Sequence, residues 1–141
     1  MSYGAGGVRG ATYRSNDVMS RPPGALIVLL YQRLLVELRK ADRQIADGDI
    51  SGRGESLGRA SAIVFELLAS LDIEAGGELG SRLSALYSYF IREIQEVERD
   101  GDRNRLRRLV DIISPLHESW VQASRLSQSG EHAILPDEPP A

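Results

Sequence analysis

Side chains that could carry out catalysis or hold a metal ion are scarce in this sequence. It contains two histidines, His117 and His132, and no cysteine, so thiolate chemistry and disulfides are excluded. Glu118 follows His117 directly, and adjacent side chains on a helix point about 100° apart, so these two do not form a ligand pair. Neither E-x-x-H nor H-E-x-x-H occurs, which argues against a di-iron bundle or a zinc protease. We therefore expect no catalytic residue, no metal site and no cofactor.

A glycine-rich segment, Gly52-x-Gly54-x-x-x-Gly58, superficially suggests a phosphate-binding loop. Its spacing differs from the dinucleotide-binding fingerprint, and no predicted strand precedes it. Inside a helix, each glycine instead costs about 0.8–1 kcal/mol relative to alanine. We expect a helix here whose start is weak.

Four arginines stand close together near the expected start of the last helix: Arg103, Arg105, Arg107 and Arg108. They could contact nucleic acid or an acidic partner. The favoured interpretation is a solvated helix face, because Leu106 and Leu109 are interleaved with the arginines and several aspartates lie nearby. The net charge of −3 also argues against broad nucleic-acid binding, which normally needs a basic domain.

Aromatic residues are more informative than the charged ones. Tyr87 and Tyr89 lie about 200° apart on a helix, so they cannot both join Phe90 in one narrow seam. One aromatic side chain must face away from the axis of a bundle. Either the surface is more apolar than a monomer requires, or these tyrosines are peripheral core residues with their hydroxyls at the water boundary.

Length and composition indicate a single domain. The chain has 141 residues, of which 42% are hydrophobic and 26% charged. No stretch approaches the roughly 20 apolar residues of a membrane span, and the first ten residues lack the apolar segment of a signal peptide. We therefore expect a cytoplasmic protein that does not insert into membranes.

Helical periodicity dominates the middle of the chain. Apolar residues recur at i, i+3, i+4 and i+7 in four stripes, which predict helices over residues 23–47, 49–71, 78–100 and 102–127. The motif Asp-Gly-Asp occurs at 47–49 and again at 100–102. Its glycine suits the left-handed end of a helix, and its second aspartate can cap the next helix. Pro115 lies inside the last stripe and predicts a kink near Ser114.

The predicted fold class is all-α. Short joints between the helices favour an antiparallel bundle of four main helices over residues 23–127. Residues 1–22 are rich in glycine and predict a flexible N-terminal arm. Residues 128–141 predict a polar, disordered tail. No segment shows the sustained alternation of a strand.

From about Tyr13 to Trp120, the sequence resembles the flagellar secretion chaperones of the FliS family. The resemblance rests on Trp120 and on four segments in order: PGALIVLLY at 23–31, LLASLD at 67–72, GGEL at 76–79 and LSALYSYF at 83–90. The chain departs from the family pattern at Gln32-Arg33, where the family has Asp-Gly, and at Ser88, where it has an acidic residue.

This resemblance implies a chaperone that binds the C-terminal segment of newly made flagellin before export, with the export apparatus as a second partner and no nucleic acid. Amphipathic helices of flagellin would lie in hydrophobic grooves of the bundle, partly covered by the arm in the free chaperone. The resemblance and the aromatic pattern suggest eight partner-binding residues: Tyr13, Leu26, Leu30, Tyr31, Leu34, Tyr87, Phe90 and Trp120. The three leucines fit the core better than the contact surface, whereas the three tyrosines are favoured as contacts.

Three other functions stay open at this point. The same apolar faces could make a self-associating bundle, including a homodimer. They could also bind a different amphipathic client. A weak nucleic-acid-binding domain would instead depend on the arginines from Arg103 to Arg108.

Overall fold

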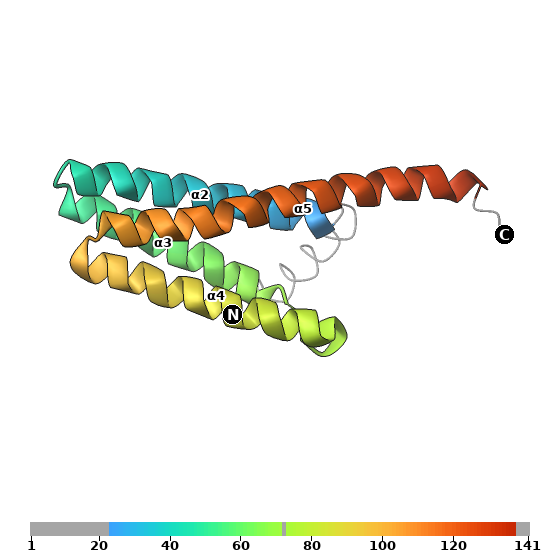
Figure 1. Cartoon of the computed structure of the whole chain (residues 1–141), viewed down its shortest axis with the longest axis horizontal. Coiled ribbons are helices and arrows are strands. Elements are labelled where there is room, and N and C mark those ends of the chain that lie inside the picture. Colours follow the sequence, from blue (N-terminus) through green and yellow to red (C-terminus); the bar gives the residue numbers. More distant parts are fainter. Residues whose placement is uncertain (1–22, 72, 138–141) are drawn as a thin grey trace, which may run out of the picture. The chain divides into compact units, whose positions relative to one another are not determined.

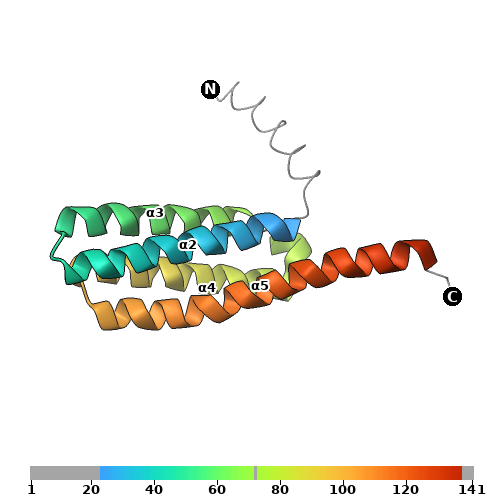
Figure 2. The same ribbon diagram turned by 90° about the horizontal axis from the view of Figure 1, so that it is seen from above.

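The computed structural model describes residues 23–71 and 73–137, which form helices α2 (Pro23–Ala46), α3 (Ile50–Ala69), α4 (Ile73–Asp100) and α5 (Arg103–Asp137). The described residues divide into two compact units, one within residues 30–117 and one that includes residues 23–29 and 118–137. Within residues 30–117 the four helices lie side by side, and each runs antiparallel to the one before it (Figures 1 and 2). The all-helical, four-helix prediction is confirmed. No described helix is both long and apolar enough to cross a membrane.

The two Asp-Gly-Asp joints form as predicted. Gly48 and Gly101 have φ of 74° and 65°, in the left-handed region that favours glycine. The Asp49 carboxylate accepts a hydrogen bond from the Gly52 N–H at 2.9 Å and caps α3. The Asp102 carboxylate accepts from the N–H groups of Asn104 and Arg105 at 2.9 and 3.2 Å and caps α5.

Arg53 closes the C-terminal end of α4 from the neighbouring helix. Its guanidinium donates to the Glu98 carbonyl oxygen at 3.2 Å, which satisfies one of the last carbonyls of α4. The same guanidinium lies against Gly101, where an added Cβ would collide with it. Gly101 is therefore favoured by its positive φ, and a larger residue there would also have to displace the end of the Arg53 side chain.

Two helix boundaries differ from the prediction. Helix α4 begins at Ile73 rather than at Glu78, but Gly77, with φ 57° and ψ −130°, breaks it into two helical pieces. Helix α5 continues to Asp137, so the predicted polar tail from residue 128 begins inside a helix. Helix α5 also continues across Pro115, and the kink near Ser114 stays a prediction.

The core of residues 30–117 receives apolar side chains from all four helices, at the spacing of the predicted stripes. Its largest fully buried members are Tyr31, Leu34, Leu38, Leu57, Val64, Leu67, Tyr87, Phe90, Ile94, Leu106, Leu109 and Ile113. Ser56 is a buried polar residue, and a hydrogen bond of 2.8 Å joins its hydroxyl to the side-chain amide of Gln44. The packing of α2 and α3 thus satisfies this polar group.

Candidate partner-binding surface

Most of the residues predicted to bind a partner lie in the core. Five of the eight are at most 2% exposed: Leu30, Tyr31, Leu34, Tyr87 and Phe90. Leu26 and Trp120 are half-buried, and Tyr13 lies outside the described residues. The core interpretation of Leu30 and Leu34 is therefore correct. In this conformation, Tyr31 and Tyr87 present no surface to a partner.

Tyr31 and Tyr87 join α2 to α4 inside the bundle. Their hydroxyl oxygens are 3.0 Å apart, in a hydrogen bond that either can donate. Their rings meet edge to face at 62°, with centroids 6.4 Å apart. Burial, followed by the hydrogen bond from Tyr31, raises the pKa of Tyr87 far above its ordinary value, so the Tyr87 hydroxyl stays protonated. The pair fixes how α2 and α4 pack against each other.

The aromatic side chain that faces away from the core is Tyr89 rather than Tyr87. Tyr89 is half-buried, and its ring packs against the fully buried Phe90 with centroids 6.2 Å apart. This arrangement agrees with the interpretation of Tyr89 as a peripheral core residue. Tyr87 and Tyr89 therefore do not form an exposed apolar surface, and such a surface is made by other residues.

That surface lies on α3. Gly58, Ala62, Phe65 and Ala69 are exposed, and their spacing of four, three and four residues places them on one face, here called the α3 strip. The Phe65 residue is 53% exposed, and an added Cβ on Gly58 would meet nothing within 4 Å. Small residues let the backbone of a partner helix come close, and Phe65 offers it an aromatic anchor. The α3 strip can therefore receive an amphipathic helix.

Sequence reasoning missed the α3 strip, although a signal was present. The buried stripe of α3 contains Leu57, Ala60, Val64 and Leu67, while the strip forms a second apolar row on the opposite side. The sequence pattern predicts Gly58 as a weak point of the helix, and Phe65 is not among the predicted site residues. A second apolar row on the side of a helix that faces away from the core can be read from the sequence, and it is the signal that indicates a surface for a further helix.

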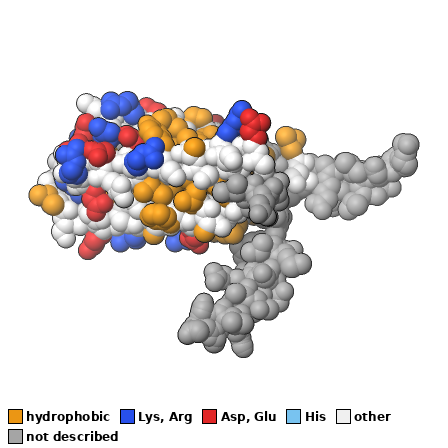
Figure 3. Space-filling view, turned by 90° about the horizontal axis from the view of Figure 1, so that it is seen from below, with side chains coloured by type: hydrophobic (Ala, Val, Ile, Leu, Met, Phe, Trp, Pro, Cys, Tyr) orange, Lys and Arg blue, Asp and Glu red, His pale blue; other side chains and the backbone are white. Residues whose placement is uncertain are grey.

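Other exposed hydrophobic residues are distributed over the surface. Within residues 30–117 the larger ones are Val36, Ile50, Leu79 and Ile112, between 38% and 69% exposed. Figure 3 shows hydrophobic side chains clustered along the middle of one face, and many charged side chains at the end that carries the two Asp-Gly-Asp joints. Apolar contact is therefore available along the flanks of the bundle, and at the end with the joints Ile50 is exposed among the charged side chains.

The arginine cluster is largely engaged within the protein. Arg103 donates to Asp42 at 2.8 and 3.3 Å, and Arg105 donates to both oxygens of Glu93 at 3.0 and 3.2 Å. The Arg103 hydrogen bond is the main reason why the pKa of Asp42 lies below its ordinary value. These pairs tie α5 to α2 and to α4. The solvated-face interpretation is wrong for Arg103 and Arg105, because tertiary partners engage them.

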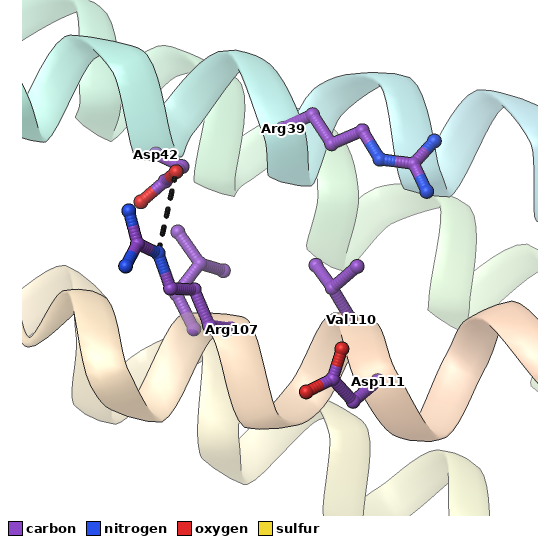
Figure 4. Close-up of a pocket in the computed structure, with 6 residues that line it drawn as sticks. Arg39, Asp42, Arg107, Val110 and Asp111 are labelled. Carbon is purple, nitrogen blue, oxygen red and sulfur yellow. Dashed lines mark ion pairs between the residues drawn. The ribbon is translucent and has the colours of Figure 1, made fainter.

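A small pocket of about 200 Å³ lies between α2 and α5. Leu106 and Val110 contribute its apolar surface, and Arg39, Asp42, Arg107 and Asp111 line the rest (Figure 4). The Arg107 guanidinium is 3.8 Å from an Asp42 oxygen. The size of this pocket suits one side chain of a partner. The charges at its rim are of both signs, so they favour neither an anion nor a cation.

The chain belongs to the class of all-helical bundles, and it leaves uncovered an apolar face of α3 that can receive an amphipathic helix. No group of metal-ligating side chains occurs among its described residues. Comparison with known proteins agrees with this class and narrows it. The model of the family described as "Flagellar protein FliS" matches residues 8–127.

Relatives from three organisms support this match over most of their length. The chain is 33% identical over 125 residues to the flagellar secretion chaperone FliS of Salmonella typhimurium, covering 86% of this chain and 93% of that protein. It is 31% identical to the flagellar secretion chaperone FliS of Campylobacter jejuni, covering 77% and 84%. It is 27% identical to the flagellar secretion chaperone FliS of Bacillus subtilis, covering 85% of this chain and 89% of that protein. The chain therefore belongs to the FliS family of flagellar secretion chaperones, which confirms the family resemblance and a non-enzymatic function.

Proposed function

We propose that this chaperone binds the C-terminal amphipathic segment of newly made flagellin, and that the α3 strip is its main helix-binding surface. The observation that carries the proposal is the uncovered apolar row of Gly58, Ala62, Phe65 and Ala69. A flagellin helix that covers this row would hide its own apolar face. Premature polymerisation, which uses such faces, would then be suppressed.

We also propose where and with what the complex acts. Because the client is held between synthesis and export, the chaperone acts in the cytoplasm and delivers flagellin to the export apparatus. Coupled folding of a disordered client spends part of its interaction energy on ordering, which keeps the complex releasable. No covalent step is needed for this function.

Size-exclusion chromatography with a peptide of the flagellin C-terminal segment tests the proposal. The wild-type chain should form a stoichiometric complex at micromolar concentration. Ala62→Glu places a carboxylate in the middle of the α3 strip and should abolish the complex, because the charge would have to be buried without a partner. Val36→Ala, at another exposed apolar position, is the matched control and should leave the complex intact.

Two results would contradict the proposal. One is a wild-type chain that forms no complex with the peptide. The other is a wild-type chain that dimerises without the peptide and loses dimerisation in Ala62→Glu, because the strip would then be a self-association surface. Light scattering on the same column distinguishes these outcomes.

A further inference from the structure

The outer side of α2 carries a row of cationic residues around one apolar residue. Arg33, Val36, Lys40 and Arg43 are three, four and three residues apart, so they lie on one face, here called the α2 face. From Arg33 to Arg43, this face extends about 15 Å along the helix. Arg33 and Arg43 are exposed, Lys40 is half-buried, and Val36 is 57% exposed. The α2 face shares no residue with the α3 strip.

The positive charge on this face is only partly offset, since Asp42 attracts Arg43 without forming an ion pair with it, and the chain as a whole has a net charge of −3. In the described part of the chain, no carboxylate forms an ion pair with Arg33, Lys40 or Arg43. The acidic residues of α2 are already engaged elsewhere. Glu37 is 3.2 Å from Arg59 of α3, and Asp42 is 2.8 Å from Arg103 of α5. The cations are therefore available to an external anion.

A hollow of about 360 Å³ lies beside Val36, lined by Gln32, Arg33, Val36 and Glu37. For comparison, a cavity of about 150 Å³ is enough to hold benzene in an engineered protein. One aliphatic side chain of a partner can therefore enter the hollow and contact Val36. The α2 face thus combines an apolar centre with a border of three cations and one carboxylate, that of Glu37, which is paired with Arg59.

We propose that the α2 face docks an acidic amphipathic helix of a second partner protein. An aliphatic side chain of that helix enters the hollow at Val36, and carboxylates three or four residues apart pair with Arg33, Lys40 and Arg43. A membrane surface would need a wider apolar face than one valine. Duplex nucleic acid would need a basic domain, which this chain is not. The proposal stands without the assignment of the α3 strip.

A designed peptide provides the test. The probe is a labelled helical 18-residue peptide with one central leucine and glutamates at matching spacing, and its control has glutamines in their place. Fluorescence anisotropy with the full chain should show binding that weakens at high salt, and the control peptide, which lacks all three pairs, should bind about 3- to 100-fold more weakly. An exposed ion pair contributes about 1.5- to 5-fold in affinity. The triple variant Arg33→Gln, Lys40→Gln and Arg43→Gln should therefore weaken binding by about 3- to 100-fold.

The matched control removes three other exposed arginines: Arg92→Gln, Arg108→Gln and Arg125→Gln. It should bind the probe with the affinity of the wild type, and urea unfolding should show that both triple variants fold. Equal affinity for the acidic and neutral peptides, or equal loss in both triple variants, would overturn the proposal. Another result would also overturn the proposal: the wild type does not bind the peptide but binds duplex DNA, or vesicles of equal phosphatidylglycerol and phosphatidylcholine, and the α2 triple variant loses that binding.

Discussion

Removing one hydroxyl of the Tyr31–Tyr87 pair should destabilise the bundle and leave the affinity for flagellin unchanged. The two rings are 0% and 1% exposed, and their hydroxyl oxygens are 3.0 Å apart. In Tyr31→Phe, the hydroxyl of Tyr87 loses this partner in a site closed to solvent, which costs about 1–3 kcal/mol of unfolding free energy. In the double variant with Tyr87→Phe, both members of the hydrogen bond are gone. The loss should then be smaller than the sum of the two single losses, by about 1 kcal/mol.

The assay is urea unfolding followed by far-UV circular dichroism, with titration calorimetry of the flagellin peptide on the same four proteins. Tyr89→Phe is the control, since Tyr89 is half-buried, and it should change the unfolding free energy by less than about 0.5 kcal/mol. Single losses that simply add in the double variant would refute the coupling. Weakened peptide binding at unchanged stability would show that these tyrosines are client contacts, as the sequence suggested.

Three further predictions concern the joints, the charged pairs and the N-terminal arm. Gly101→Ala should lower the unfolding free energy, because it introduces a Cβ at positive φ. Gly54→Ala, in open space on α3, should raise the unfolding free energy by about 0.5–1 kcal/mol, and urea unfolding measures both changes. The Asp42–Arg103 pair lowers the pKa of Asp42 below 3.8, so its stabilisation should be complete above this pH and should disappear as the pH falls through the lowered pKa. Unfolding titrations should show that this loss is absent in Asp42→Asn. Deleting residues 1–17 should speed association with the flagellin peptide in stopped-flow measurements, and an unchanged rate with unchanged affinity would refute an arm that covers the site.

The sequence was sufficient for the features that depend on local chemistry. Glycine at 48 and 101 and aspartate at 49 and 102 define the joints, because the left-handed conformation and helix capping involve only neighbouring residues. The apolar stripes likewise predicted the buried side of each helix. These features need no knowledge of what a helix packs against.

The candidate site could not be predicted in the same way, because it depends on which face of each helix remains uncovered. Tyr31 and Tyr87 are 56 residues apart in sequence, and only the packing of α2 on α4 brings their hydroxyls together inside the core. Phe65 is at the surface because no described neighbour covers its side of α3. Both outcomes are decided by tertiary packing, which helical periodicity does not specify.

Calorimetric titration of the flagellin C-terminal segment into the wild type and Phe65→Ala tests the central claim most directly. Full burial of a phenylalanine removes about 150–250 Å² from water. Because the residue is 53% exposed, a client helix can still cover about half of that area. At about 25 cal/mol per Å², its loss should cost about 2 kcal/mol, or about 30-fold in Kd. The account predicts this loss in Phe65→Ala and an unchanged Kd in the control Val36→Ala. Equal affinity of Phe65→Ala and the wild type would contradict it.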